Sequence, residues 1–339
     1  LAAKGAQVLV LEKYIIPGGS GGSFKRKGYT FDVGASMIFG FGEKGYTNLL
    51  TRALRDVNEK CETIPDPVQL EYHLPNNFSI SVDKNYDKFI SKLSTFFPKE
   101  EDGIKKFYGT CANVFNCLDS MPLLSIEDPS YLFKVFLKSP MSCLGLARWL
   151  PVNAGDVARK FIKDPELLKF IDIECFCWSV MPALKTPMIN AGMVFTDRHA
   201  GGINYPKGGV GKIAEKLVSG IEKLGSKIRY KANVNEILLE DEKAVGVKLS
   251  NGEKIYSNII VSNSTRWDTF GLKNKMKGLI SSDRVPKSEY KWSETYKPSP
   301  SFVSIHLGVE KKLINNNFNC HHIIVEDWDE LESEKGVIF

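Results

Sequence analysis

A glycine-rich loop directly after a short apolar strand restricts the folds open to this chain more than any other feature. Residues 7–11 form a Val/Leu-rich run that ends at Glu12, which is typical of a strand buried on both faces of a parallel sheet. The segment from Tyr14 to Ser36 then contains Pro17-Gly18-Gly19-Ser20-Gly21-Gly22. Because glycine lets the backbone turn tightly and approach a ligand closely, the pattern predicts a binding loop on a doubly wound α/β domain.

Glu12 lies at the strand end where a dinucleotide-binding fold carries an acid. In such folds the carboxylate accepts hydrogen bonds from the adenosine ribose hydroxyls. A solvated strand end explains an isolated glutamate about equally well. The accompanying glycine fingerprint lies roughly 20 residues before the acid, which is upstream of Leu1. We therefore expect the first strand and its phosphate-binding turn to be missing.

Both ends of the chain have the pattern of interrupted elements. Leu1 to Gly5 predicts the last turn of a helix closed by glycine. Lys335 to Phe339 has the pattern of a strand that has just begun. The expectation is a chain cut at both ends, so the sequence carries no information on targeting segments.

The composition of the chain argues against several classes of function. With 339 residues, 43% hydrophobic and 25% charged, the chain is long enough for two globular domains. The net charge of +5 comes from scattered lysines rather than a basic stripe, which argues against nucleic-acid binding. Its longest apolar runs are far shorter than the roughly 20 residues of a membrane span. The seven cysteines form no C-x-x-C pair, so we predict reduced thiols and no metal site.

The remaining periodicities outline the architecture. Residues 69–73 and 78–82 predict a β-hairpin around Pro75-Asn76-Asn77. Residues 83–194 have helical spacing interrupted by prolines, which predicts several short helices. The pattern after Gly211 predicts an amphipathic helix that ends at Gly225. Short strands are then predicted at 227–230, 234–239, 244–249, 254–256 and 258–262, with an Asn251-Gly252 hairpin turn.

One helical segment, residues 131–150, is apolar enough to face either lipid or a core. It contains Tyr131-Leu132-Phe133-Lys134-Val135-Phe136-Leu137 and then Met141, Leu144, Leu146, Trp149 and Leu150. Burial in a core is the preferred interpretation of this segment.

The loop and the residues after it resemble a known signature. Leu11-Glu12-Lys13, Pro17-Gly18-Gly19, Gly28-Tyr29-Thr30-Phe31-Asp32 and Gly34 follow the order of the flavin-binding segment in phytoene desaturases and related amine-oxidase-like flavoproteins. Residues 197–211, DRHAGGINYPKGGVG, together with 262–271, SNSTRWDTFG, and 171–176, IDIECF, resemble the carotenoid isomerase branch of that family. The resemblance extends along essentially the entire chain. The lysine-rich stretch 273–291 departs from it mildly.

The resemblance implies the fold and the cofactor site. It implies an α/β, Rossmann-like FAD-binding domain of the amine-oxidase and phytoene-desaturase type, formed by residues 1–66 and 206–270. A substrate domain of helices and antiparallel sheet would comprise 67–205 and 271–339. The FAD-binding residues it implies are Glu12, Lys13, Gly18, Gly19, Ser20, Gly34, Val234 and Ser262. Taken singly, Val234 would be a core residue and Ser262 a strand cap.

The resemblance also implies an activity, namely flavin-dependent cis-trans isomerisation of a poly-cis carotenoid without net redox change. The hypothesis is that reduced FAD lends electron density or hydride to the polyene, so that a cis double bond can rotate. A carotenoid substrate and a plastid membrane surface would be the partners. A desaturase or retinol-saturase-like reductase is the enzymatic alternative, and a carotenoid-binding protein without cofactor is the other. The chain expressed alone is expected to retain little or no FAD.

Other polar residues leave their alternatives open. Arg198 and His199 fit a substrate tunnel, a buried hydrogen-bonded pair or a surface pair. His321 and His322 are adjacent in a predicted strand and point to opposite faces, so a structural role is preferred to a shared metal. Cys175 and Cys177 are interpreted as inert thiols. No catalytic base is nominated.

Overall fold

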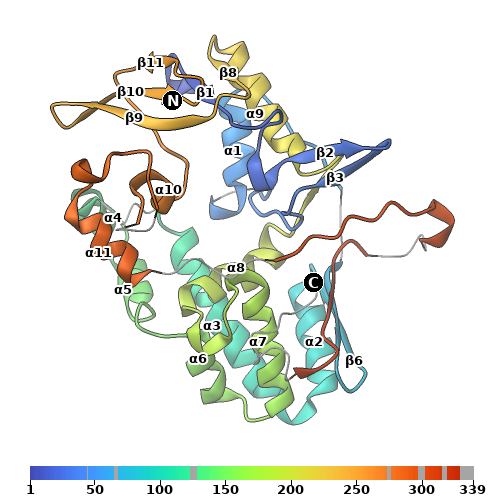
Figure 1. The fold of residues 1–339 in the computed structure, drawn as a ribbon. Helices are drawn as coiled ribbons and strands as arrows, with labels where there is room; N and C mark the ends of the chain where they lie inside the picture. The colour runs from blue at the N-terminus through green and yellow to red at the C-terminus, as the bar shows by residue number, and fades with distance from the viewer. Residues whose placement is uncertain are drawn as a thin grey trace. The chain divides into compact units, whose positions relative to one another are not determined.

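A computed structural model describes residues 1–43, 45–64, 68–122, 128–272, 276–296, 302–314 and 319–328. The chain divides into two compact units, each assembled from separate stretches of sequence (Figure 1). Unit 1 comprises Leu1–Gly34, Asp56–Glu59 and Gly208–His306, and unit 2 comprises Ala35–Arg55, Lys60–Lys207 and Leu307–Phe339. The predicted strand start at 335–339 and part of the lysine-rich stretch, 273–275, lie outside the described residues. The assignment of cofactor and substrate domains to particular boundaries stays a prediction.

Unit 1 contains a parallel pair that includes the strand predicted at residues 7–11. Strand β1 (Leu9–Leu11) pairs in parallel with β8 (Lys227–Arg229). The prediction that β1 is buried on both faces is wrong, because Leu9 is 44% and Val10 37% exposed. Among the described residues this sheet has two strands, which is too narrow for helices to cover both faces of β1. The chain before β1 forms a 3-10 turn at Ala2–Lys4. It ends at Gly5 with φ 86°, which agrees with the predicted helical turn closed by glycine.

An antiparallel meander follows β8, as predicted. Strands β9 (Val234–Glu240), β10 (Lys243–Leu249) and β11 (Lys254–Tyr256) pair in the order β11-β10-β9. Gly252 has φ 89° in the turn between β10 and β11, so the Asn251-Gly252 turn is confirmed. A further hairpin is formed by β2 (Ser23–Arg26) and β3 (Tyr29–Asp32). The predicted amphipathic helix is α9 (Gly211–Lys223), which is followed by Gly225 at φ 77°.

The strand predicted at 258–262 is wrong. Among the described residues this segment joins no β-sheet and has no strand conformation. Ile259 is 73% and Val261 72% exposed. A strand exists only through hydrogen bonds to a neighbour, so an apolar run without one stays an extended segment. Helices α10 (Arg266–Phe270) and α11 (Lys287–Thr295) follow it.

Unit 2 is built on the predicted hairpin. Strands β5 (Val68–Leu74) and β6 (Phe78–Asp83) are antiparallel, and β12 (His322–Ile324) adds in parallel to β5. The turn is made by Asn76 and Asn77, with φ of 62° and 57°, which is the left-handed conformation that asparagine tolerates in two-residue hairpins. A short ladder joins β4 (Thr63–Ile64) to β7 (Tyr205–Pro206).

In the described part of the predicted helical region, seven helices share one hydrophobic core with this sheet (Figure 1). They are α2 (Tyr86–Phe96), α3 (Glu101–Asp119), α4 (Pro129–Lys138), α5 (Pro140–Ala147), α6 (Ala154–Phe161), α7 (Pro165–Ser179) and α8 (Met188–Ala200). Helix α1 (Leu49–Asp56) precedes β4. Prolines begin α4, α5 and α7, because the first helical position needs no N–H.

Helix α3 packs closely on α8 at a glycine, and this contact predicts a stability difference. A Cβ on Gly192 would lie 2.7 Å from Val114 Cβ, whereas a Cβ on Gly109 of α3 would meet nothing within 4 Å. We expect Gly192→Ala to destabilise the chain by about 1–3 kcal/mol through overpacking. Gly109→Ala should instead stabilise it by about 0.5–1 kcal/mol through helix propensity. Urea unfolding of both variants measures the difference, and equal effects would contradict the tight contact.

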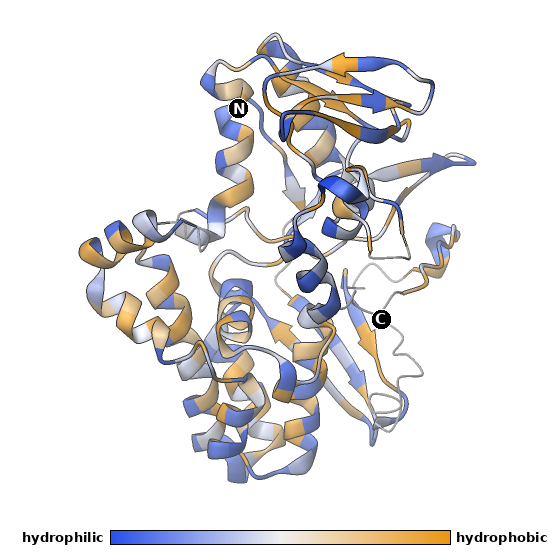
Figure 2. Cartoon of the chain, turned by 60° about the vertical axis from the view of Figure 1, so that its left-hand side comes forward, coloured by the Kyte–Doolittle hydropathy of each residue, from blue (hydrophilic) through white to orange (hydrophobic). Residues whose placement is uncertain are grey.

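The preference for burial of residues 131–150 is wrong for much of the segment. Val135 and Leu146 are buried, but Phe133 is 62%, Leu137 64% and Met141 79% exposed. Helices α4 and α5 are short, and only one stripe of each faces the core, so the remaining apolar side chains point outward. Figure 2 marks the hydrophobic residues of these helices in orange. Within the described ranges, no helix combines the length and the apolar character needed to cross a membrane.

Candidate cofactor site

The glycine-rich loop of unit 1 has the conformation that only glycine adopts easily. Gly18 has φ 104° and Gly19 φ 53°. A Cβ on Gly18 would lie 3.0 Å from Ala214 Cβ in α9 and 3.0 Å from the Gly22 backbone nitrogen. The loop therefore lies against the first turns of α9, and a side chain at position 18 would separate them.

Ser20 and Gly34 lie next to each other in this unit. A Cβ on Gly34 would lie 3.7 Å from the Ser20 carbonyl oxygen. The Val33 N–H donates to the Gly22 carbonyl oxygen at 3.0 Å, which fixes the end of β3 to the loop. Four predicted site residues, Gly18, Gly19, Ser20 and Gly34, are thus brought together.

Two residues that the sequence reasoning did not nominate hold the loop at the helix. The Ser23 Oγ accepts from the Gly211 N–H at 2.7 Å, and the Asp32 Oδ1 accepts from the Val210 N–H at 2.8 Å. Ser23 also donates to Asp32 at 2.5 Å. These contacts satisfy N–H groups that a helix start leaves open, and the carboxylate is favoured at its positive end. The Phe-Asp-x-Gly element was a signal for Asp32, whereas Ser23 carried none.

Glu12 follows β1 and is anchored through its backbone. Its N–H donates to the Arg229 carbonyl at 2.9 Å, and its carbonyl accepts from the Ala232 N–H at 2.9 Å. The Oε1 atom accepts from the Tyr14 N–H at 2.8 Å. The half-buried Val234 begins β9 two residues after Ala232, while Lys13 is exposed. The structure thus places Glu12 beside the segment that leads into Val234.

Ser262 has a different environment from the other nominated residues. It is exposed in the extended segment before α10, and its Oγ lies 2.8 Å from the Thr269 Oγ1. The described contacts join it to α10 and not to the glycine-rich loop. Its role at the cofactor stays a prediction.

The residues around the loop fit a dinucleotide. Gly18 and Gly19 expose backbone without a Cβ beside a helix, and such backbone meets phosphate oxygens closely. Glu12 presents a carboxylate at the carboxyl end of a parallel strand, where ribose hydroxyls are bound in this fold.

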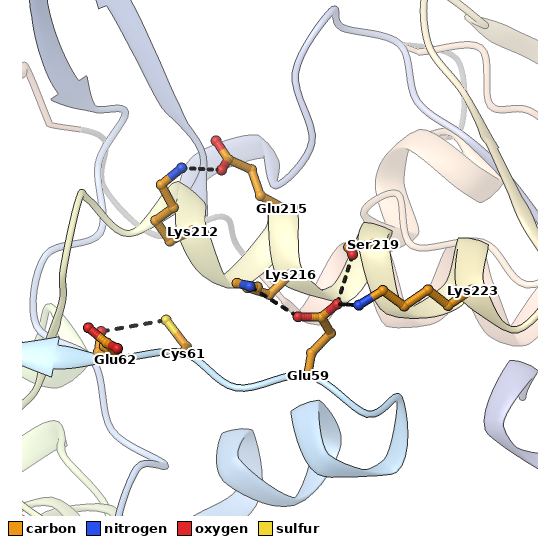
Figure 3. A network of polar contacts seen from close by, with 8 residues as sticks. All are labelled: Glu59, Cys61, Glu62, Lys212, Glu215, Lys216, Ser219 and Lys223. Atoms are coloured by element: carbon orange, nitrogen blue, oxygen red, sulfur yellow. Dashed lines mark hydrogen bonds and ion pairs between the residues drawn. The ribbon is translucent and has the colours of Figure 1, made fainter.

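A carboxylate on the other flank of α9 holds the helix to the segment 56–59. The Glu59 side chain is 5% exposed and accepts from the Lys223 Nζ at 2.5 Å, the Ser219 Oγ at 2.7 Å and the Lys216 Nζ at 3.1 Å (Figure 3). Hydrogen bonds from Lys223, then Ser219 and Lys216, lower the pKa of Glu59 from 4.5 to about 2. Nearby, a Cβ on Gly220 would lie 2.4 Å from Val57 Cγ2, so this contact is close.

The lowered pKa of Glu59 predicts a pH dependence of stability. Its contribution is fully present above pH 4.5, the ordinary pKa, and is lost as the pH falls towards 2. We expect Glu59→Gln to unfold at a lower temperature at pH 7 and to lose less stability than the wild type between pH 4.5 and 2. Glu215→Gln is the control, since Glu215 is 53% exposed and pairs with Lys212 (Figure 3). Identical pH profiles for Glu59→Gln and wild type, measured by thermal unfolding, would contradict the assignment.

Unit 2 contains a buried charged cluster. Arg198 and Glu174 are both fully buried, and the Arg198 guanidinium donates to the Glu174 carboxylate. The Tyr108 hydroxyl donates to the other carboxylate oxygen. The guanidinium also lies over the Phe89 and Phe195 rings, 4.9 Å and 5.1 Å from their centroids. Of the alternatives considered for Arg198, the structure shows a buried, hydrogen-bonded side chain.

His199 belongs to the same cluster. Its Nε2 accepts from the Arg198 Nε at 3.2 Å, and its ring contacts Tyr86 and Phe89. Burial, and then the positive charge of Arg198, lower the pKa of His199 to about 3. His199 is therefore neutral at pH 7, as a hydrogen-bond acceptor of Arg198 must be.

The cysteines behave as the sequence suggested. All seven lie within the described residues, and none of them forms a disulfide there. Burial raises the pKa of Cys175 and of Cys177, which disfavours the reactive thiolate. Inert thiols are the interpretation that this chemistry supports.

Comparisons with known proteins agree with this geometry. Residues 1–54 match the profile of an NAD(P)-binding Rossmann-like domain. The chain is 55% identical, over all of its length and 54% of the relative, to "Prolycopene isomerase, chloroplastic" of Daucus carota. It is 55% identical to "Prolycopene isomerase 1, chloroplastic" of an Oncidium hybrid cultivar, over its whole length and 57% of that relative. It is 27% identical to an all-trans-retinol 13,14-reductase of Danio rerio, over 80% of this chain and 45% of that one.

Solved structures share the fold. An oxidoreductase from Methanosarcina mazei aligns over 88% of this chain and 62% of its own, with 18% identity and a TM-score of 0.59. A cyclohexylamine oxidase from Brevibacterium oxydans aligns over 86% of this chain and 60% of its own, with 15% identity and a TM-score of 0.52. At these identities the likeness concerns the fold alone.

Fold and loop together define an α/β protein with a Rossmann-like dinucleotide-binding domain and amine-oxidase-like structural neighbours. The predicted fold class is confirmed. Within that class, the chain is a homologue of the prolycopene isomerases along its entire length. It spans a little over half the length of these curated relatives.

Proposed function

We propose that the complete protein carrying this sequence is an FAD-dependent isomerase that converts a poly-cis carotenoid, prolycopene, into all-trans-lycopene without net redox change. The observation that carries the proposal is the 55% identity to a prolycopene isomerase over the entire chain. The 27% identity to a retinol reductase is far lower, which favours isomerisation over reduction.

The proposed cofactor is FAD, held by the predicted site residues of unit 1. Glu12 would bind the adenosine ribose, and Val234 would pack against the adenine. Lys13, Gly18, Gly19 and Ser20 would surround the pyrophosphate, with Gly34 beside them and Ser262 at a further point of the cofactor. In reduced form, FAD supplies electron density that weakens a double bond of the substrate. The hydrogen bonds that Ser23 and Asp32 accept from the start of α9 would hold the glycine-rich loop beside this site.

The proposed location is a plastid membrane surface, because the carrot and orchid relatives are named chloroplastic and a carotenoid dissolves in membranes. Helices α4 and α5 offer the contact. Their exposed apolar side chains include Phe133, Leu137, Met141 and Leu144. Helix α4 also carries two basic residues, Lys134 and Lys138. An apolar face with basic residues beside it is typical of an interfacial helix.

The membrane contact predicts a loss of vesicle binding. Phe133→Ser/Leu137→Ser/Met141→Ser should weaken binding to vesicles containing anionic lipid at least about 100-fold, since each buried apolar side chain is worth roughly 1.5 kcal/mol or more. Ile259→Ser/Val261→Ser is the control, because those side chains are as exposed but lie in another segment. Co-sedimentation measures binding. Unchanged binding of the triple variant would rule out this face.

Product analysis tests the proposed reaction. The complete protein would be incubated with reduced FAD and prolycopene in liposomes without oxygen, and the products separated by chromatography and weighed by mass spectrometry. The proposal expects all-trans-lycopene of unchanged mass. A product changed by two hydrogens would indicate a desaturase or a saturase. Tight carotenoid binding without flavin and without a product would indicate a binding protein.

A further inference from the structure

Three metal-ligating side chains converge on one face of the sheet in unit 2. Glu71 and His73 are two residues apart in β5, so their side chains lie on the same face. In the parallel pair, His322 of β12 is in register with Glu71. The antiparallel partner of His73 on β6 is Ser79. The register of the three strands brings the side chains of Glu71, His73, Ser79 and His322 together.

The ligand atoms are close together. The His73 Nε2 lies 3.0 Å from the His322 Nδ1, and the His322 Nδ1 lies 3.5 Å from the Glu71 Oε2. One atom from each of the three residues lies within 4.8 Å of the others. The His322 and Glu71 side chains are 16% and 28% exposed, so ions have access to them.

For a neutral His322 ring, the hydrogen bonds assign the tautomer. Its Nε2 lies 3.1 Å from the Asn319 carbonyl oxygen. A carbonyl oxygen only accepts, so the Nε2 carries the hydrogen. In a neutral imidazole the other nitrogen is then an acceptor, and the His322 Nδ1 directs a lone pair towards His73.

The tautomer of His73 follows in the same way. The Ser79 Oγ donates its only hydrogen to the Tyr72 carbonyl oxygen at 3.1 Å. It therefore accepts from the His73 Nδ1, 3.0 Å away. The His73 Nε2 is then a lone-pair donor as well. The two imidazole lone pairs therefore point at each other, with the ring centroids 5.3 Å apart, and a carboxylate oxygen lies beside them. A cation beside the two nitrogens would relieve this repulsion, with each ring turning towards the ion.

We propose that Glu71, His73 and His322 form a binding site for a divalent transition metal, Zn²⁺ by its ligand set. Two imidazole nitrogens and one carboxylate oxygen are a known zinc combination. Ligands about 2.0–2.2 Å from one ion lie roughly 2.8–3.6 Å apart for angles between 90° and tetrahedral. The 3.0 Å and 3.5 Å separations fall inside that range.

Hydrogen bonds from neighbouring groups hold the three ligand side chains in place. Ser79 orients His73, the Asn319 carbonyl orients His322, and the Asn319 Nδ2 donates to the Glu71 Oε1 at 2.6 Å. Such contacts orient the ligating nitrogens and raise metal affinity. Because β12 comes from the last part of the chain and β5 from the first third, a bound ion would tie these two distant segments together.

Metal titration tests the site on the intact chain stripped of metal by a chelator. We expect one Zn²⁺ per chain by calorimetry, a rise in unfolding temperature with Zn²⁺ concentration, and visible ligand-field absorption with Co²⁺ in its place. His73→Gln and His322→Gln should each lower Zn²⁺ affinity at least about 100-fold, and Ser79→Ala about tenfold. Circular dichroism verifies that each variant is folded.

His306→Gln is the matched control, because His306 is an exposed histidine of unit 1 and its loss should leave affinity unchanged. No Zn²⁺ binding by the wild type up to about 1 mM would overturn the proposal and leave a proton shared between the two rings. Binding that survives in both histidine variants, or thiolate charge-transfer absorption with Co²⁺, would place the metal on cysteines and also overturn it.

Discussion

Glu174→Gln is expected to destabilise the chain by about 3–5 kcal/mol, because it leaves a fully buried arginine without its counter-charge. Arg198 and Glu174 have no exposed side-chain surface. Desolvation alone would lower the pKa of Arg198, yet the carboxylate of Glu174 and the Tyr108 hydroxyl raise it. Glu174→Gln removes the larger of these raising causes, but arginine is not deprotonated in proteins, because its ordinary pKa lies above 12. The guanidinium therefore stays charged in the variant and keeps its desolvation cost. Urea unfolding monitored by circular dichroism measures the loss.

A double-mutant cycle separates the pair from its surroundings. Arg198→Met should also be strongly destabilising, whereas Glu174→Gln/Arg198→Met should cost less than the sum of the single changes, since no charge is left buried. Lys106→Gln is the control: Lys106 and Asp102 form an exposed pair, which is worth about 0–1 kcal/mol. Additive effects, or a loss below about 1 kcal/mol for Glu174→Gln, would contradict the role of the pair.

Glu12→Ala is expected to weaken FAD binding by the complete protein about 10- to 150-fold. Hydrogen bonds to a charged group contribute about 1.5–3 kcal/mol, which corresponds to that range of dissociation constant. The Glu12 backbone is held by Arg229 and Ala232, so truncating the side chain should leave β1 in place. Flavin fluorescence titration measures the affinity.

Glu240→Ala is the control for Glu12→Ala. Glu240 is an exposed glutamate at the end of β9, so it matches Glu12 in chemistry and in its position at a strand end. Its removal should leave FAD affinity unchanged. Equal affinity of both variants would show that Glu12 does not contact the ribose.

The sequence predicted those elements whose signals are local. The Asn-Asn and Asn-Gly turns, the proline-started helices and the glycine after α9 are dictated by backbone preferences of one or two residues. The glycine-rich loop was predicted for the same reason. Glycine adopts positive φ easily, and Gly18 and Gly19 have positive φ values.

Predictions that depended on distant neighbours failed or were not made. The apolar runs at 7–11 and 258–262 indicate strands, but their burial depends on which segments lie beside them. Helices α4 and α5 look like core segments by composition, and only packing decides that Phe133 and Leu137 face outward. The adjacent pair His321-His322 cannot share one ion, yet His322 meets His73, which is 249 positions away. No local sequence pattern indicates that β12 pairs with β5 in this register.

The number of product molecules formed per reduced flavin, without oxygen, tests the central claim of isomerisation most directly. The complete protein would receive a limiting amount of reduced FAD and an excess of prolycopene, while absorbance follows the flavin and chromatography follows the carotenoid. We expect many molecules of all-trans-lycopene per flavin, with the flavin still reduced at the end. One product molecule per flavin, with flavin oxidation in equal amount, would contradict the account and identify a reductase.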